Sequence, residues 1–458
     1  MQSPRFLSIG FVSLGCAKNL VDSEVMAARL MAAGWPLASA PEQAEIVIVN
    51  TCAFIRDAKA ESIEAIIEAC AWKTRGRCRA VLVAGCLPQR YRHGLQDALP
   101  EVDAWIGLDE VTRIETVVRR LVNGERGFAE ISRSARAVIE PPGSRVVFTG
   151  APFAYVKIAE GCHHHCRFCS IPRIRGRYRS RPMRRIVAEA EALLAGGIRE
   201  LNLISQDITS YGRDLGSQAD LPNLLRALGA IGGRFWIRLL YGHPAHVTNR
   251  LLKVMGEVSQ VCHYLDIPIQ HSHPDVLRAM GRPPVPGGMR HLVQRIRKAL
   301  PDAALRTTCL VGFPGETRLH FNHLADFLED IRFDHAGVFA YSREDGTPAA
   351  RLASQVPHKT AERRRDRLMR LQQRIVFQKS RERVGQSTEI LIEKRDIRKQ
   401  NTCNCLSGAW VGRSRAEAPE VDGVVFVKTR KPATRPGAFI SVRYVSVAGY
   451  DMRAVPVP

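Results

Sequence analysis

The chain has 458 residues, so a length of roughly 150 residues per domain predicts about three domains. With 45% hydrophobic and 24% charged residues, its composition excludes disorder as the main state, and no stretch reaches the roughly 18 apolar residues of a membrane span. The 67 Lys and Arg residues exceed the 45 Asp and Glu residues and give a net charge of +22. This charge favours nucleic acid or the ribosome as a partner.

The first apolar segment, residues 6–14, is typical of a strand and not of a signal sequence. It is short, it is interrupted by Gly10, and only one basic residue, Arg5, precedes it. We therefore expect a cytoplasmic protein without a membrane anchor. In that reducing environment the twelve cysteines are more often metal ligands or free thiols than disulfides.

Strand-like and helix-like runs alternate through the first 130 residues. The strands are expected at residues 6–14, 46–49 and 80–84, and the helices at 23–33 and 58–70. This alternation predicts an open parallel sheet with crossover helices. Cys16, Cys52 and Cys86 each follow one of these strands, so they are expected to meet at the carboxyl edge of the sheet, where α/β proteins bind ligands.

A polar linker at residues 133–150 precedes a second α/β series. Its six strands are expected at residues 154–158, 200–205, 235–240, 264–267, 305–311 and 335–339, with helices such as 184–194 between them. This series predicts a partial or full (β/α) barrel, in which polar groups at the strand ends point into the cavity. A charged helix at 361–383 follows it.

The last segment of the chain reads as a small antiparallel β-barrel. Its five short strands are expected at residues 388–393, 409–412, 423–428, 438–444 and 446–452. The expected domains are therefore residues 1–135, 148–380 and 384–458. The basic side chains of the C-terminal barrel suit either a solvated surface or a contact with RNA.

The cysteine run Cys162-His-His-His-Cys166-Arg-Phe-Cys169 directly follows the first strand of the second series. Three thiolates in one loop can hold three irons of a cubane cluster and leave the fourth iron open to a cofactor or substrate. A structural zinc ion with His163, His164 or His165 as its fourth ligand is the alternative, although no second pair of ligands lies nearby.

The chain resembles the radical S-adenosylmethionine methylthiotransferases over nearly its whole length. The resemblance is carried by the cysteine run and by residues 154–162, 171–176, 180–182, 15–24, 50–52, 85–86, 266–271, 311–317 and 341–348. It implies an N-terminal methylthiotransferase domain with a 4Fe-4S cluster on Cys16, Cys52 and Cys86. It also implies a radical barrel with a second 4Fe-4S cluster on Cys162, Cys166 and Cys169, and a C-terminal TRAM domain.

Two branches of this family differ in substrate. Residues 18–24, 205–207 and 413–423 are similar to the branch that methylthiolates the β-carbon of an aspartate in small-subunit ribosomal protein S-twelve. The other branch modifies an adenosine of transfer RNA and is the alternative, as is a non-catalytic iron–sulfur electron carrier. The resemblance implies S-twelve or the small ribosomal subunit and an external electron donor as partners. The family pattern does not account for Cys403 and Cys405.

The chemistry implied by the resemblance requires a radical. The β-carbon of aspartate carries an unactivated C–H bond, which a positioned acid or base does not cleave at useful rates, so no acid–base catalyst is expected. Contacts to S-adenosylmethionine are expected from Phe168, beside Cys169, and from Gln206, Arg238 and Gln270 at the ends of barrel strands. Loop packing for Phe168 and hydrogen bonding to neighbouring backbone for the other three are the alternatives.

Overall fold

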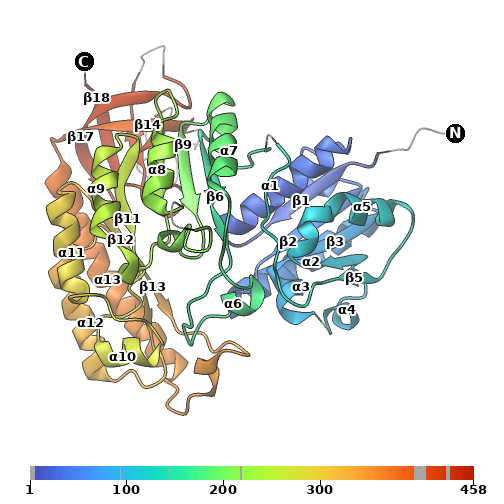
Figure 1. Ribbon diagram of the computed structural model, residues 1–458, viewed down its shortest axis with the longest axis horizontal. Coiled ribbons are helices and arrows are strands. Elements are labelled where there is room, and N and C mark those ends of the chain that lie inside the picture. The colour runs from blue at the N-terminus through green and yellow to red at the C-terminus, as the bar shows by residue number, and fades with distance from the viewer. Residues whose placement is uncertain are drawn as a thin grey trace.

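The computed structural model describes residues 6–92, 94–143, 145–216, 219–396, 409–429 and 434–457. Cys403 and Cys405 lie outside these residues. The described chain folds around a five-stranded sheet, a six-stranded sheet and a closed five-stranded barrel, in that order along the sequence (Figure 1). None of its described helices is long and apolar enough to cross a membrane.

The N-terminal sheet is wholly parallel, and its strands lie side by side in sequence order. The strands are β1 (Ile9–Ser13), β2 (Ile46–Thr51), β3 (Ala80–Gly85), β4 (Ala104–Ile106) and β5 (Phe128–Glu130). The helices are α1 (Ala17–Ala32), α2 (Arg56–Arg75), α3 (Cys86–Tyr91), α4 (Leu95–Ala98) and α5 (Ile114–Val122). Every residue of β2 and β3 is buried, which explains their unbroken apolar runs. The three expected strands are confirmed, whereas β4 and β5 are too short to give a clear sequence signal.

All six strands expected in the second series are present in one open parallel sheet, so the barrel is partial. They are β6 (Phe153–Lys157), β9 (Glu200–Ile204), β10 (Trp236–Leu239), β11 (Val261–Asp266), β12 (Ala304–Val311) and β13 (His335–Ala340). The connecting helices are α6 (Ile171–Ile174), α7 (Met183–Ala195), α8 (Leu221–Gly229), α9 (Asn249–Glu257), α10 (Pro274–Ala279), α11 (Gly288–Ala299) and α12 (Arg318–Ile331). A short antiparallel pair, β7 (Ala159–Glu160) and β8 (Arg179–Ser180), flanks the loop that contains Cys162, Cys166 and Cys169.

The long basic helix α13 (His358–Arg383) leads into the C-terminal barrel. The barrel strands are β14 (Ser387–Arg395), β15 (Trp410–Ser414), β16 (Val425–Val427), β17 (Phe439–Ala448) and β18 (Asp451–Pro456). The expected strand at 446–452 is wrong, because β17 continues to Ala448 and the chain turns at Gly449 before β18. Gly449 has φ +71°, a conformation that suits a glycine in a tight turn.

The C-terminal barrel covers the amino ends of the strands in the six-stranded sheet. Arg413 of β15 pairs with Glu200, the first residue of β9, at 2.5 Å. Asp422 accepts a hydrogen bond from Tyr264 at 2.7 Å and pairs with His335, the first residue of β13. Figure 1 shows this barrel at one end of the sheet and the N-terminal domain beside β6. The carboxyl ends of the strands therefore remain available for the cysteine loop.

Candidate active site

The three N-terminal cysteines, here called the N-terminal triad, lie at the carboxyl ends of three adjacent strands. Cys16 caps α1 three residues after β1, Cys52 follows β2 directly, and Cys86 follows β3 directly and begins α3. Cys52 and Cys86 are buried, whereas Cys16 is exposed. The parallel order β1-β2-β3 thus brings together cysteines that are far apart in sequence.

Two glycines allow the cysteine-bearing turns to approach each other closely. Gly15 has φ +87°, and a Cβ there would lie 2.6 Å from the Cβ of Cys52. Gly85 has φ +98°, and a Cβ there would overlap the side chain of Asn50. Any larger residue at either position would push the turns apart, so both positions require glycine.

Asn19 joins the three turns of the N-terminal triad. Its amide nitrogen donates to the carbonyl oxygens of Leu14 at 3.1 Å and Thr51 at 2.8 Å, in the turns that precede Cys16 and Cys52. Its side-chain oxygen accepts from the thiol of Cys86 at 3.6 Å. Asn19 is fully buried and therefore fixes the relative positions of all three cysteine turns.

The positive charges near the N-terminal triad favour thiolates. Although the side chain of Cys16 is partly open to solvent, the surrounding protein desolvates its thiol and raises its pKa. The charges of Lys18 and Arg175 outweigh this effect and leave the pKa below its usual value. Burial raises the pKa of Cys86 to about 12 despite the opposing charge of Arg175. A bound metal ion replaces these thiol protons, so the nearby cations become counter-charges for the ligands.

The second set of cysteines, the loop triad, lies beyond the carboxyl end of β6. The amide of Cys169 donates to the carbonyl of Cys166 at 3.0 Å, which folds the loop back on itself. The guanidinium of Arg282 lies 3.8 Å from the sulfur of Cys166. Burial raises the pKa of Cys162 to about 11 and that of Cys169 to about 12. The loop therefore presents three thiols near one cationic side chain.

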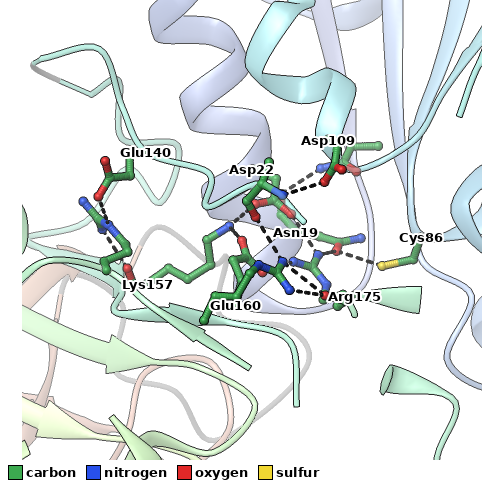
Figure 2. A network of polar contacts seen from close by, with 12 residues as sticks. Asn19, Asp22, Cys86, Asp109, Glu140, Lys157, Glu160 and Arg175 are labelled. Atoms are coloured by element: carbon green, nitrogen blue, oxygen red, sulfur yellow. Dashed lines mark hydrogen bonds and ion pairs between the residues drawn. The ribbon is translucent and has the colours of Figure 1, made fainter. Parts of the chain in front are cut away.

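A buried set of five polar residues, the interdomain network, connects the two triads. Figure 2 shows Asn19 and Asp22 from α1 facing Lys157, Glu160 and Arg175 from the six-stranded sheet and its loops. The guanidinium of Arg175 contacts Asn19 at 2.6 Å, Asp22 at 2.8 Å and Glu160 at 3.1 Å. The ammonium of Lys157 pairs with both carboxylates. Two positive and two negative charges thus compensate each other without solvent.

The interdomain network joins residues that lie close to each triad along the sequence. Asn19 and Asp22 lie on α1, three and six residues after Cys16, whereas Glu160 is two residues before Cys162. Lys18 of α1 also lies over the ring of Tyr241, which follows β10, at 3.5 Å from the ring centroid. The start of α1 is therefore tied to the carboxyl side of the six-stranded sheet at two places.

Unpartnered polar atoms lie within β9, at Asn202, and directly after its carboxyl end, next to Asp207, which contacts His164 of the cysteine loop at 2.7 Å. The side-chain hydroxyl of Ser205 and both polar atoms of Gln206 and Asn202 are buried, and they have no hydrogen-bond partner among the described residues. Buried polar groups are normally satisfied, so this set fits a polar ligand such as S-adenosylmethionine. Gln206, expected to contact that cofactor, belongs to this set.

The structure gives Phe168 and Gln270 different surroundings. Phe168 packs against the cluster of apolar side chains that includes Met280, Phe313 and Tyr341, which corresponds to the loop-packing alternative. Gln270 follows β11, and its backbone bridges to Cys309 of β12 with φ +66°. A left-handed conformation is uncommon for a non-glycine residue and is often found at functional sites.

The expected contact between Arg238 and the cofactor is wrong. Its fully buried guanidinium donates to Glu200 at 2.7 Å and to the carbonyl of Arg415 in the C-terminal barrel, also at 2.7 Å. These partners lie at the amino side of the six-stranded sheet, away from the carboxyl ends that carry the cysteine loop. Arg238 therefore joins two domains, because Glu200 and the barrel carbonyls satisfy its donors.

The histidines of the cysteine loop have partners other than thiols. His164 lies 2.7 Å from Asp207 and stacks on His243, with ring centroids 4.4 Å apart. Two groups of described residues gather closely enough for a single metal ion, and neither contains a cysteine: one is His164, His243 and His246, and the other is His273, Asp275 and His320. Ligands of one zinc ion lie about 2.3 Å from it and hence near one another, whereas a cubane places its thiolates on separate irons. The geometry thus suits a cluster better than zinc.

Three family models match the chain in the order of its three sheets. Residues 8–107 match an uncharacterized protein family, UPF0004, residues 156–328 match the radical SAM superfamily, and residues 384–457 match the TRAM domain. The second and third matches agree with the partial barrel and the small C-terminal barrel described above.

Relatives similar over almost the full length decide the family. The chain is 43% identical to the ribosomal protein uS12 methylthiotransferase RimO of Syntrophus aciditrophicus, covering 98% of each chain. It is 44% identical to RimO of Pelotomaculum thermopropionicum, covering 97% of this chain and 98% of the relative. The chain belongs to the RimO family. Members of the RimO family are radical S-adenosylmethionine enzymes that use 4Fe-4S clusters, and the two cysteine triads lie within the matched regions.

Solved structures share the RimO fold at low sequence identity. The radical S-adenosylmethionine methyltransferase TsrM from Kitasatospora setae, with cobalamin and a 4Fe-4S cluster bound, has a TM-score of 0.55 and 15% identity, covering 75% of this chain and 77% of TsrM. The cobalamin-dependent enzyme OxsB has a TM-score of 0.51 and 12% identity, covering 80% of this chain and 56% of OxsB. At these identities the likeness concerns the fold alone.

Sequence reasoning missed the interdomain network of this RimO family member. Asn19 and Asp22 follow Cys16 at spacings that place them on one side of α1, which is a usable signal. Lys157 was another, since a charged residue in a fully buried strand requires a partner. Glu160 lies only three residues from Lys157, but no sequence pattern identifies its other partner, Asp22, which lies 135 residues away.

Proposed function

We propose that this chain methylthiolates the β-carbon of an aspartate in ribosomal protein uS12. The relatives named as uS12 methylthiotransferases support this substrate over transfer RNA. The observation that carries the proposal is the interdomain network, in which Arg175 bonds residues next to both cysteine triads. Two cysteine sets held close together suit a reaction in which a radical formed at one must meet sulfur from the other.

Six cysteines are the proposed cluster ligands: Cys16, Cys52 and Cys86 for one 4Fe-4S cluster, and Cys162, Cys166 and Cys169 for the other. Each set provides three thiolates, which leaves one iron of each cubane without a protein ligand. When bound, the loop-triad cluster supplies the electron for cleavage of S-adenosylmethionine to a hydrogen-abstracting radical, and the N-terminal cluster supplies a site for sulfur.

The side chains of this chain bind and orient the reactants. Ser205 and Gln206 offer buried hydrogen-bonding atoms to the cofactor, and Gln270 is proposed to contact it from the segment that follows β11. Lys157 and Arg175 neutralise the buried carboxylates that would otherwise lie beside the thiolates. The interdomain network also closes the boundary between the domains to water, which protects a radical from quenching.

The proposed domain boundaries are 1–135, 148–380 and 384–458. The partners are uS12, free or in the small ribosomal subunit, and an external electron donor. The location is cytoplasmic. The TRAM domain is proposed to contact ribosomal RNA near uS12, because its match and the excess positive charge of the chain suit a polyanion.

The proposal is tested with reduced, cluster-loaded enzyme, S-adenosylmethionine and a peptide from uS12. Mass spectrometry should detect a methylthio group on the aspartate, and a peptide with asparagine at that position should remain unmodified. Transfer RNA is incubated in parallel. Modification of the RNA in place of the peptide would contradict the substrate. Absence of deoxyadenosine formation would favour an electron carrier.

A further inference from the structure

A cavity of about 420 Å³ opens where the helices that follow the two triads meet. Helix α3, which begins at Cys86, contributes Arg90, and the turn after it contributes Arg92. Helix α6 and the residue before it contribute Arg173 and Ser170, the latter directly after Cys169. The cavity is thus lined by α3, which begins at Cys86, and by the segment that directly follows Cys169, and these two cysteines belong to different triads.

Ser170 and Arg173 present unused hydrogen-bond donors at this cavity. Ser170 is 2% exposed, and its hydroxyl has no hydrogen-bond partner among the described residues. The two residues are three positions apart, so they lie on the same side of one helical turn. Within the described chain, the guanidinium of Arg173 has no ion pair or hydrogen bond, although Asp345 also lines the cavity.

Arg90 of α3, which also lines the cavity, is already engaged. Arg90 pairs with Glu344 at 3.0 Å and donates to the carbonyl of Ala53 at 2.6 Å, so it forms a fixed wall. Gly346 forms the opposite side with φ +78°, and a Cβ there would overlap the guanidinium of Arg173. Glycine at this position therefore leaves room for Arg173 beside the loop backbone.

We propose that this cavity is the subsite for the side-chain carboxylate of the substrate aspartate, with Arg173 as its cation and Ser170 as a second donor. The inference rests on the proposed function, because it assigns the carboxylate to an aspartyl peptide. A guanidinium and a hydroxyl provide the charged and neutral donors that a carboxylate accepts. Holding that carboxylate would restrain the adjacent β-carbon beside the segments that follow Cys86 and Cys169.

The carboxylate of S-adenosylmethionine is a second source of the same chemistry. The position of the cavity favours the peptide, because α3 of the N-terminal domain forms one of its walls. The unpartnered atoms of Ser205 and Gln206 offer a separate polar site at the end of β9 for the cofactor. Arg173 is also exposed, as a contact to an incoming protein substrate requires.

The test compares two uS12 peptides, one with the target aspartate and one with asparagine, on cluster-loaded enzyme. Binding is measured by fluorescence anisotropy, and methylthiolation is measured by mass spectrometry. Wild type should bind the aspartyl peptide more tightly. Arg173→Gln should weaken that binding by about tenfold to a hundredfold and remove the preference, the range expected for a bond to a charged group. Arg173→Lys should restore part of it.

Arg184→Gln, an exposed arginine of α7 outside the cavity, is the matched control and should bind both peptides as wild type does. An unchanged preference for aspartate in Arg173→Gln would overturn the subsite. A raised Kd for S-adenosylmethionine with unchanged peptide binding would assign the cavity to the cofactor and also overturn it. If the wild-type enzyme modifies transfer RNA and no uS12 peptide, the proposed function itself is wrong. That result concerns the wild type alone and is therefore distinct from every result obtained with the Arg173 variants.

Discussion

The guanidinium of Arg175 donates a hydrogen bond to the side-chain oxygen of Asn19, 2.6 Å away, across the boundary between two domains. The same oxygen accepts from the thiol of Cys86 at 3.6 Å, so one buried amide connects a barrel-side cation to a cysteine turn. The N-terminal triad is therefore shaped partly by a residue outside its own domain.

Replacing Arg175 should destabilise the protein strongly. Arg175→Ala leaves Asp22 and Glu160 with Lys157 as their remaining buried partner, and breaking such a network costs about 3–5 kcal/mol. The free energy of unfolding is measured by urea denaturation of the cluster-free protein. Arg184→Ala, on the exposed side of α7, should change it by less than about 0.5 kcal/mol. Equal effects of the two substitutions would contradict this role.

Removing the side chain of Asn19 should affect the N-terminal cluster selectively. Asn19→Ala removes the bonds to Leu14 and Thr51 that hold two cysteine turns together. Iron and sulfide per chain should fall by about half, while deoxyadenosine formation continues. Asn123→Ala, at the exposed end of α5, serves as the control. Full cluster content in Asn19→Ala would exclude the proposed function of this amide.

Cysteines of the two triads should give different phenotypes. Cys166→Ala should abolish deoxyadenosine formation, because the loop triad is proposed to bind the cofactor-cleaving cluster. Cys52→Ala should leave cofactor cleavage measurable and stop sulfur insertion. Liquid chromatography of deoxyadenosine and mass spectrometry of the peptide measure the two steps. Cys70→Ala, on α2 outside both triads, should retain both. Sulfur insertion by Cys52→Ala would refute the assignment.

Acid should loosen the C-terminal barrel from the six-stranded sheet. Burial raises the pKa of Glu200, but the charges of Arg413 and Arg238 outweigh it and leave this pKa below its usual value. Burial also raises the pKa of Asp422, and the charges of His335 and Arg306 likewise leave it below its usual value. A carboxylate with a lowered pKa stabilises the folded state above its ordinary pKa, and this contribution is lost as the pH falls through the folded value.

The expected window for this loosening lies below about pH 4.5. Hydrogen exchange measured from pH 7 to pH 3 should show β15 losing protection in this range before β2 and β3 of the N-terminal sheet. Glu200→Gln should lower the protection of β15 already at pH 7 and reduce its dependence on acid. Protection of β15 that is constant down to pH 3 would contradict the assignment.

Local patterns predicted most of the strands. The six strands of the partial barrel, and the positions of Cys16, Cys52 and Cys86 at strand ends, followed from apolar runs and their spacing. The strand expected at 446–452 was wrong, because the β-branched run of β17 continues to Ala448 and only a short turn at Gly449 separates it from β18. The cofactor contact expected of Arg238 was wrong, because the position of a residue in a strand does not reveal which domain covers the amino side of the sheet.

The amino-acid sequence by itself determined the two cysteine triads, the kinds of sheet and the family resemblance, because these depend on residue type and on spacing along the chain. Only the tertiary structure decided that Arg175 meets Asn19, that Arg238 meets the C-terminal barrel, and that Ser170 and Arg173 line a cavity beside α3. The physical reason is that charge compensation and cavity shape depend on distances between residues far apart in the chain, which spacing along the sequence does not specify.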